Sequence, residues 1–135
     1  MTEDTDSLCV CVVESDEAIR MSLARLLRAS RIDTQLFSSL SEFNNAPRRS
    51  QHSCLLVDLR SLSPREYAML TQPTAATRSM PPLIAVSDLE DEASQRKARE
   101  LGARFLLHKP VDGQALLDAI HWITDASEPV VISKG

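Results

Sequence analysis

The feature of this sequence that most constrains its fold is the alternation of short apolar runs with segments of helical periodicity. A continuous apolar run is typical of a β-strand that is covered on both faces, as in a parallel sheet between two layers of helices. The sequence predicts strands at Leu8 to Val13, Thr34 to Phe37, Cys54 to Val57, Leu83 to Val86 and Phe105 to Leu107.

The segments between these runs predict helices. Ile19, Leu23, Leu26 and Leu27 fall on one face of a helix that follows the first strand. The other helices are predicted from their start and stop signals. Two helices are expected to begin at Ser39-x-x-Glu42 and Ser63-Pro64-x-Glu66. A third is expected from Asp91 to Leu101, where Gly102 stops it. Asp112 is expected to cap the last helix, which has an apolar face of Leu116, Ala119, Ile120 and Ile123.

Five strands that alternate with five helices predict a doubly wound α/β domain, in which a parallel sheet carries helices on both faces. The 135 residues fit one such domain, which we expect at residues 8–125 between flexible tails at 1–7 and 126–135. In folds of this class the ligand site lies beyond the carboxyl ends of the strands. The residues directly after each strand are therefore the candidates for function.

Composition narrows the function. The net charge is −4 and no stretch is strongly basic, which argues against direct nucleic-acid binding, because that requires a basic surface. No apolar run approaches the roughly 20 residues that span a bilayer, and the N-terminal MTEDTDS is acidic, unlike a secretory signal. We therefore expect a cytoplasmic protein with no membrane partner, whose three cysteines are buried structural thiols.

The residues after the first, third, fourth and fifth predicted strands include the charged side chains at the strand ends. Because parallel strands end at a common edge, carboxylates, a hydroxyl and an ammonium group would meet there. Clustered carboxylates repel one another unless a hard cation lies among them, and oxygen ligands suit Mg²⁺. A carboxylate can also attack a phosphoryl group. The candidates are Glu14, Ser15 and Asp16, then Asp58, then Ser87 and Asp88, and finally Lys109 and Pro110.

The segments VVESDEAIR, LLVDLR, LIAVS and KP, in this order and each at a strand end, resemble the receiver domain of CheY- and FixJ-type response regulators of two-component signalling. The resemblance covers residues 8–125. It implies a flavodoxin-like strand order of 2-1-3-4-5. It also implies a signalling switch rather than an enzyme, with self-phosphorylation and autodephosphorylation as its only chemistry.

The resemblance also implies roles for single residues. Asp58 matches the aspartate that receives a phosphoryl group from a histidine kinase or phosphotransfer protein. Ser87 matches the hydroxyl residue that hydrogen-bonds the phosphate and shifts on activation, and Lys109 matches the lysine that pairs with it. Pro110 matches the proline that follows in a cis peptide bond.

The implied metal site departs from the family pattern. Glu14 matches the first member of the acidic pair near Mg²⁺, and Arg60 matches the residue whose backbone carbonyl is a metal ligand beside Asp58. Ser15 stands where the family has its second acidic residue, with Asp16 one position along as the alternative ligand. We therefore expect Mg²⁺ to bind more weakly than a complete acidic pair would allow.

Two further departures leave the function open. Asp88 stands where the family has a small residue, and it either repels an incoming phosphoryl group or caps the next helix. Leu106 stands at a switch position that is usually Tyr or Phe, with Phe105 displaced by one. The alternative to a phosphorylated switch is a degenerate receiver that binds a target, or a second copy, through its fourth and fifth strands and helices without phosphorylation.

A hydrolase of the haloacid dehalogenase type is a third possibility, because it also uses an aspartate at a strand end. That class needs Asp-x-Asp after its first strand. Asp58-Leu59-Arg60 lacks the second carboxylate, so the sequence disfavours this class.

Overall fold

The computed structural model describes residues 8–46, 54–72, 74, 80–88 and 91–125. One five-stranded sheet has the order β2-β1-β3-β4-β5, and each neighbouring pair of strands is parallel. The predicted fold class and strand order are confirmed. The strands are β1 (Cys9–Val13), β2 (Asp33–Phe37), β3 (Cys54–Asp58), β4 (Leu83–Ser87) and β5 (Phe105–His108).

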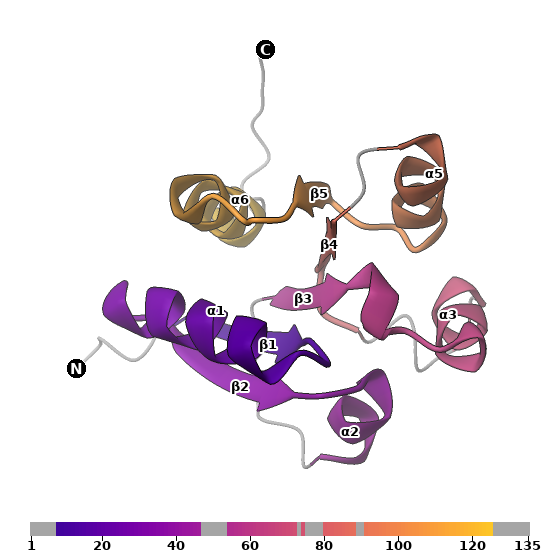
Figure 1. Ribbon diagram of the computed structural model, residues 1–135, viewed down its shortest axis with the longest axis horizontal. Helices are drawn as coiled ribbons and strands as arrows, with labels where there is room; N and C mark the ends of the chain where they lie inside the picture. The colour runs from indigo at the N-terminus through magenta and orange to yellow at the C-terminus, as the bar shows by residue number, and fades with distance from the viewer. Residues whose placement is uncertain (1–7, 47–53, 73, 75–79, 89–90, 126–135) are drawn as a thin grey trace.

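The helices form two layers, one on each face of the sheet (Figure 1). The helices α1 and α6 cover one face, while α2, α3 and α5 cover the other. A short 3₁₀ turn, η2 (Leu59–Ser61), directly follows β3. The helices are α1 (Glu17–Ala29), α2 (Leu40–Asn45), α3 (Pro64–Thr71), α5 (Glu92–Glu100) and α6 (Gly113–Asp125).

Each face of the sheet has its own apolar core. Val10 and Val12 of β1 pack in the core under α1 and α6, whereas Cys11 and Val13 pack in the core under α2 and α5. Successive side chains of a strand point to opposite faces, so a strand between two helical layers must be apolar throughout. The strands β1, β3 and β4 are buried along their whole length.

The three cysteines are buried free thiols, as predicted. Cys54 lies in the core under α1 and α6, and Cys11 lies in the core under α2 and α5. Burial, followed by the neighbouring Cys11 and Cys9, raises the pKa of the Cys54 thiol to about 12. Cys54 therefore stays protonated at neutral pH and acts as a small apolar side chain.

The helix starts follow the predicted signals. Ser63 and Glu66 form a complete capping box at the start of α3. The hydroxyl of Ser39 accepts from the backbone N–H of Glu42 at 3.1 Å, as predicted for α2. In a complete capping box the Glu42 carboxylate would accept from the backbone N–H of Ser39. Here it accepts from the backbone N–H of Ser38 instead, at 2.7 Å.

The last two helices also begin and end near their signals. Asp91 caps α5, and the carboxylate of Asp112 accepts from the backbone N–H of Ala115 at 2.8 Å in the first turn of α6. Gly102 follows α5 with a φ of +77°, a left-handed conformation that favours glycine. None of the described helices is long and apolar enough to cross a membrane. The predicted tails at 1–7 and 126–135 lie outside the described residues.

Candidate functional site

The carboxyl ends of the central strands bring the candidate residues to one rim. The register pairs Asp58 of β3 with Val86 of β4, and Ser87 of β4 with His108 of β5, so these strands end side by side. Glu14 follows β1, and its backbone N–H donates to the carbonyl of Phe37 at 3.0 Å. Glu14, Asp58 and Ser87 are all buried.

Lys109 joins the two buried carboxylates. Its Nζ lies 3.2 Å from Oε1 of Glu14 and 3.3 Å from Oδ2 of Asp58. Two carboxyl groups thus share one ammonium group, so the cluster has more acidic than basic groups. A buried charge is costly unless it is paired, so this cluster is suited to an added positive group.

The pKa values of this cluster reflect burial and mutual charge. Burial and the nearby Asp58 raise the pKa of Glu14, against the opposing effects of the Asp16 backbone N–H and the Lys109 ammonium. Burial lowers the pKa of Lys109, but the carboxylates of Asp58 and Glu14 outweigh it, so that the pKa lies above its usual value. Lys109 therefore remains a cation at neutral pH.

A hydroxyl that the sequence analysis did not single out also contacts Asp58. Ser61, in the η2 turn, donates to Oδ2 of Asp58 at 3.0 Å and accepts from the backbone N–H of Ser15 at 2.8 Å. Its Oγ is also 3.1 Å from the Ser15 hydroxyl. The spacing in the sequence could have indicated this contact. Ser61 is three positions after Asp58, and a 3₁₀ turn brings residues three positions apart close together.

Asp16 and Arg60 are both engaged near the rim. Asp16 is exposed, and its carboxylate caps α1 by accepting from the backbone N–H of Ile19 at 3.0 Å. Its own backbone N–H donates to Oε2 of Glu14 at 3.1 Å. The backbone N–H of Arg60 donates to Oδ1 of Asp58 at 3.4 Å.

Ser87 ends β4 and has contacts on two sides. Its Oγ lies 2.9 Å from Oγ of Ser94 in α5. Its carbonyl accepts from the backbone N–H of Lys109 at 2.9 Å. The peptide bond between Lys109 and Pro110 is cis.

Asp88 does not cap the next helix, so that alternative is wrong. The N-cap of α5 is Asp91, whose carboxylate accepts from the backbone N–H of Ser94 at 2.9 Å. Asp88 instead forms an ion pair with the Arg60 guanidinium at 2.5 Å. The hydrogen bond from Arg60 lowers the pKa of Asp88, so both side chains stay charged.

Phe105 and Leu106 point to opposite faces of β5. Phe105 packs against the core under α1 and α6, whereas Leu106 packs against the core under α2 and α5. The aliphatic Leu106 therefore lies on the side of the sheet that carries α5, and the aromatic ring lies on the other side.

The oxygen atoms at the rim fit a magnesium site with few protein ligands. Within the described ranges no group of three or more His, Cys, Asp or Glu side chains is placed to hold a metal ion. Mg²⁺ is commonly held by one or two carboxylates together with waters and phosphate oxygens. Glu14 and Asp58 supply two buried carboxylates, and the residue after β1 is Ser15. These oxygen atoms are therefore compatible with Mg²⁺. A site with a second acidic residue in place of Ser15 would have three carboxylates, whereas this rim has two, from Glu14 and Asp58.

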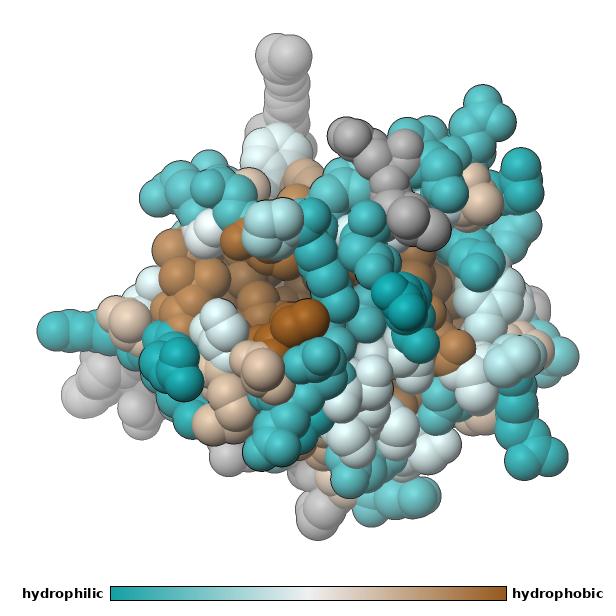
Figure 2. All heavy atoms as spheres, in the orientation of Figure 1, coloured by the Kyte–Doolittle hydropathy of each residue, from teal (hydrophilic) through white to brown (hydrophobic). Residues whose placement is uncertain are grey.

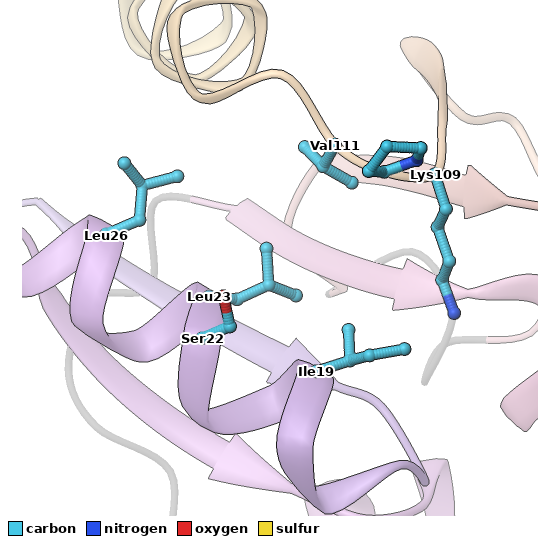
Figure 3. Close-up of a pocket in the computed structure, with 7 residues that line it drawn as sticks. Ile19, Ser22, Leu23, Leu26, Lys109 and Val111 are labelled. Carbon is cyan, nitrogen blue, oxygen red and sulfur yellow. The ribbon is translucent and has the colours of Figure 1, made fainter.

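An apolar groove borders the rim on the side of α1. It has a volume of about 430 Å³, and Figure 3 shows Ile19 and Leu23 of α1 on one side of it and Val111 on the other. In the space-filling view the brown, hydrophobic surface gathers over the helical layer that contains α1 and α6 (Figure 2). Lys109 contributes to both the groove and the rim.

The chain matches a family model and curated relatives. The model of the "Response regulator receiver domain" matches residues 10–121. Transcriptional regulatory protein FixJ of Azorhizobium caulinodans is 30% identical over 115 residues, which cover 85% of this chain and 54% of that protein. Nodulation protein W of Bradyrhizobium diazoefficiens is 31% identical over 121 residues, covering 88% of this chain and 52% of that protein. The chain thus spans about half the length of the curated relatives it matches.

A solved structure agrees with these matches. The structure of response regulator StyR has a TM-score of 0.74 and 31% identity, and the match covers 89% of this chain and 60% of that one. The residues that the family model matches, 10–121, include all five strands apart from Cys9, the first residue of β1. This chain belongs to the response regulator receiver domain family of two-component signal transduction.

Proposed function

We propose that this receiver domain is a phosphoryl-accepting signalling switch and that Asp58 is its phosphoacceptor. The observation that carries the proposal is the buried Asp58 carboxylate at the end of β3, with the Lys109 ammonium 3.3 Å from Oδ2. A buried nucleophile next to a fixed cation is the arrangement that phosphoryl transfer requires, because the cation stabilises charge on the transferred oxygens.

The proposed donor is a phosphohistidine of a histidine kinase or phosphotransfer protein. An oxygen of Asp58 forms the new bond to phosphorus while the phosphorus–nitrogen bond breaks, and the imidazole nitrogen keeps the electron pair and takes up a proton. Lys109 then pairs with the phosphoryl group, and Ser87 donates its hydroxyl to it. Mg²⁺, held by the carboxylates of Glu14 and Asp58 and the carbonyl of Arg60, would neutralise the phosphoryl oxygens.

The output of the switch is a change in partner binding at the face formed by β4, α5, β5 and α6. Two features support this choice. Ser87 contacts α5 directly, so a shift of its hydroxyl reaches that face. Trp122 of α6 is 65% exposed beside a groove that Phe105 and Leu107 of β5 also line. An exposed tryptophan next to apolar side chains is typical of a protein contact, here with a target protein or a second copy.

Labelling with a small phosphodonor tests the proposal. Incubation with acetyl phosphate and Mg²⁺, followed by intact mass measurement, is expected to add one phosphoryl group to the parent. Omission of Mg²⁺ should abolish or strongly slow the reaction. A parent protein that takes up no phosphoryl group from acetyl phosphate or from any histidine kinase contradicts the proposal.

The second candidate function is an interaction module that does not depend on phosphorylation. Two observations favour it. Ser15 stands in place of a carboxylate at the rim, and the residue directly after Ser87 is an aspartate, Asp88, whose carboxylate pairs with Arg60. Under this function Asp58→Asn binds the same partners with the same affinity as the parent.

A further inference from the structure

A pair of buried hydroxyl groups connects the end of β4 to α5. The Oγ of Ser87 and the Oγ of Ser94 are 2.9 Å apart. Both residues are buried, with 3% and 8% of their surfaces exposed. A buried hydroxyl needs a hydrogen-bond partner, so this contact matters to the position of both side chains.

Ser94 is itself fixed in place. Its backbone N–H donates to the carboxylate of Asp91, the N-cap of α5, at 2.9 Å. Ser94 thus lies in the first turn of α5, where its backbone and its hydroxyl both contact Asp91. The same hydroxyl also contacts Ser87. Any displacement of the Ser87 hydroxyl changes the contact that holds this turn to the sheet.

We propose that Ser94 is a positioning residue that holds the Ser87 hydroxyl toward α5 and thereby opposes the phosphorylated state. The inference rests on the proposed function, in which Ser87 donates to a phosphoryl group on Asp58. Either hydroxyl can donate in this contact, but the Ser94 hydroxyl also hydrogen-bonds the carboxylate of Asp91, which only accepts. The single proton of the Ser87 hydroxyl therefore serves Ser94, and Ser87 gives up this contact when it turns that proton to the phosphoryl oxygen. The loss of this contact releases the first turn of α5 and carries the signal from the rim to the output face.

The affinity of the full chain for beryllofluoride, an analogue of the acyl phosphate, tests the inference at saturating Mg²⁺. Ser94→Ala removes the contact from the unphosphorylated state only, so this variant is expected to bind beryllofluoride about fivefold tighter, the equivalent of one neutral hydrogen bond. In a Ser87→Ala background the same substitution should change the affinity by less than about twofold, because the contact is already absent.

Two further variants separate this role from a general loosening of α5. Gln95→Gly loosens α5 at an exposed position and leaves Ser87, Ser94 and the cap unchanged, so it is expected to lower the thermal midpoint without the gain in affinity. Ser94→Thr keeps a hydroxyl and should bind as the parent does. Should Ser94→Ala not fold, Ser94→Cys takes its place, because a thiol is only a weak donor of similar size.

The outcomes distinguish the inference from the proposed function. If the parent binds beryllofluoride and Ser94→Ala binds it no tighter, the inference is wrong and the switch at Asp58 stands. An equal gain in Gln95→Gly also overturns it, since helix loosening then explains the effect. If the parent neither binds beryllofluoride nor takes up a phosphoryl group, the proposed function is wrong and the inference falls with it.

Discussion

The guanidinium of Arg60 and the carboxylate of Asp88 form an ion pair of 2.5 Å across the rim of the sheet. The pair links the turn after β3 to the end of β4. Arg60 lies two positions after Asp58, and Asp88 directly follows Ser87. Arg60 compensates the charge of Asp88 at this point. An unpaired Asp88 would repel an anionic phosphodonor. We expect the Arg60 guanidinium to reduce this repulsion.

The ion pair predicts opposite effects of its two members on phosphorylation. Asp88→Ala removes a negative charge and leaves Arg60 to attract an anionic donor, so labelling by acetyl phosphate should become about two- to fivefold faster, with a larger gain at low salt. Arg60→Ala leaves Asp88 unpaired and should slow labelling by a similar factor. Initial rates measured by intact mass at two salt concentrations provide the test.

The double variant Arg60→Ala with Asp88→Ala serves as the control, and its rate should return close to that of the parent. The thermal midpoint of Asp88→Ala should be nearly unchanged, because exposed ion pairs contribute little to stability. Rates that are insensitive to salt in all three variants would show that the pair does not affect the approach of the donor.

Ser15 is predicted to limit the affinity of the rim for Mg²⁺. Ser15→Asp adds a carboxylate to a rim that already has Glu14 and Asp58, so the dissociation constant for Mg²⁺ should fall on the order of tenfold. Calorimetry is the suitable measurement, because Trp122 lies on α6 and need not report on the rim. Ser15→Asn, which adds no charge, should leave the affinity close to that of the parent. An equal affinity in Ser15→Asp and the parent would mean that Asp16 already supplies the ligand or that the rim binds no Mg²⁺.

Glu66 makes stability depend on pH. Its carboxylate accepts from the backbone N–H and hydroxyl of Ser41, at 3.0 and 2.7 Å, and from the backbone N–H of Ser63 at 3.0 Å. Burial raises the pKa of Glu66, but these hydrogen bonds outweigh burial and lower it from the ordinary value. A lowered pKa in the folded state adds stability above the ordinary carboxyl range, and this stability is lost as the pH falls through the folded pKa.

Glu66→Gln is therefore expected to lose about 1–2 kcal/mol of unfolding free energy at pH 7, because an amide replaces a carboxylate that accepts several bonds. The difference from the parent should shrink as the pH falls through the ordinary carboxyl range and then through the lowered pKa of Glu66, because the parent carboxylate is then protonated as well. Glu92→Gln, at an exposed position in the first turn of α5, is the matched control and should show little change. Denaturant unfolding across this pH range checks the prediction, and a constant difference at all pH values would refute it.

Lys109 contributes to stability as well as to the proposed chemistry. Lys109→Met removes the ammonium group from two buried carboxylates, at 3.2 and 3.3 Å, and the free energy of unfolding should fall by about 2–4 kcal/mol. Adding Glu14→Gln should restore part of this loss, since only one buried carboxylate then remains unpaired. Denaturant unfolding of the single and double variants measures both effects. A double variant that is less stable than Lys109→Met would show that Glu14 does not carry the unpaired charge.

The residues that end the strands could be placed from the sequence. The apolar runs predict the strands, and parallel strands end at a common edge, so Asp58 and Ser87 were expected together. The helix starts were also predictable, because Ser63 and Asp91 cap through contacts with the next few residues. Local spacing carries this information, and a single sequence is sufficient to read it.

Side-chain contacts between separate segments could not be predicted in this way. Arg60 and Asp88 lie 28 positions apart, and Ser61 and Ser15 lie 46 apart. Whether such residues meet depends on the path of each loop and on rotamers, neither of which leaves a periodic signal. The capping role for Asp88 was wrong for a local reason, because α5 begins at Glu92 and takes the nearer Asp91 as its cap.

The most direct test of the central claim is the chemical identity of the labelled residue. After incubation with acetyl phosphate and Mg²⁺, the parent should carry one phosphoryl group that hydroxylamine removes, as expected for an acyl phosphate. Asp58→Asn should carry none, and Ser61→Ala should still be labelled, since its hydroxyl only contacts the acceptor. Labelling of Asp58→Asn to the same extent as the parent, or a group that resists hydroxylamine, would contradict Asp58 as the phosphoacceptor.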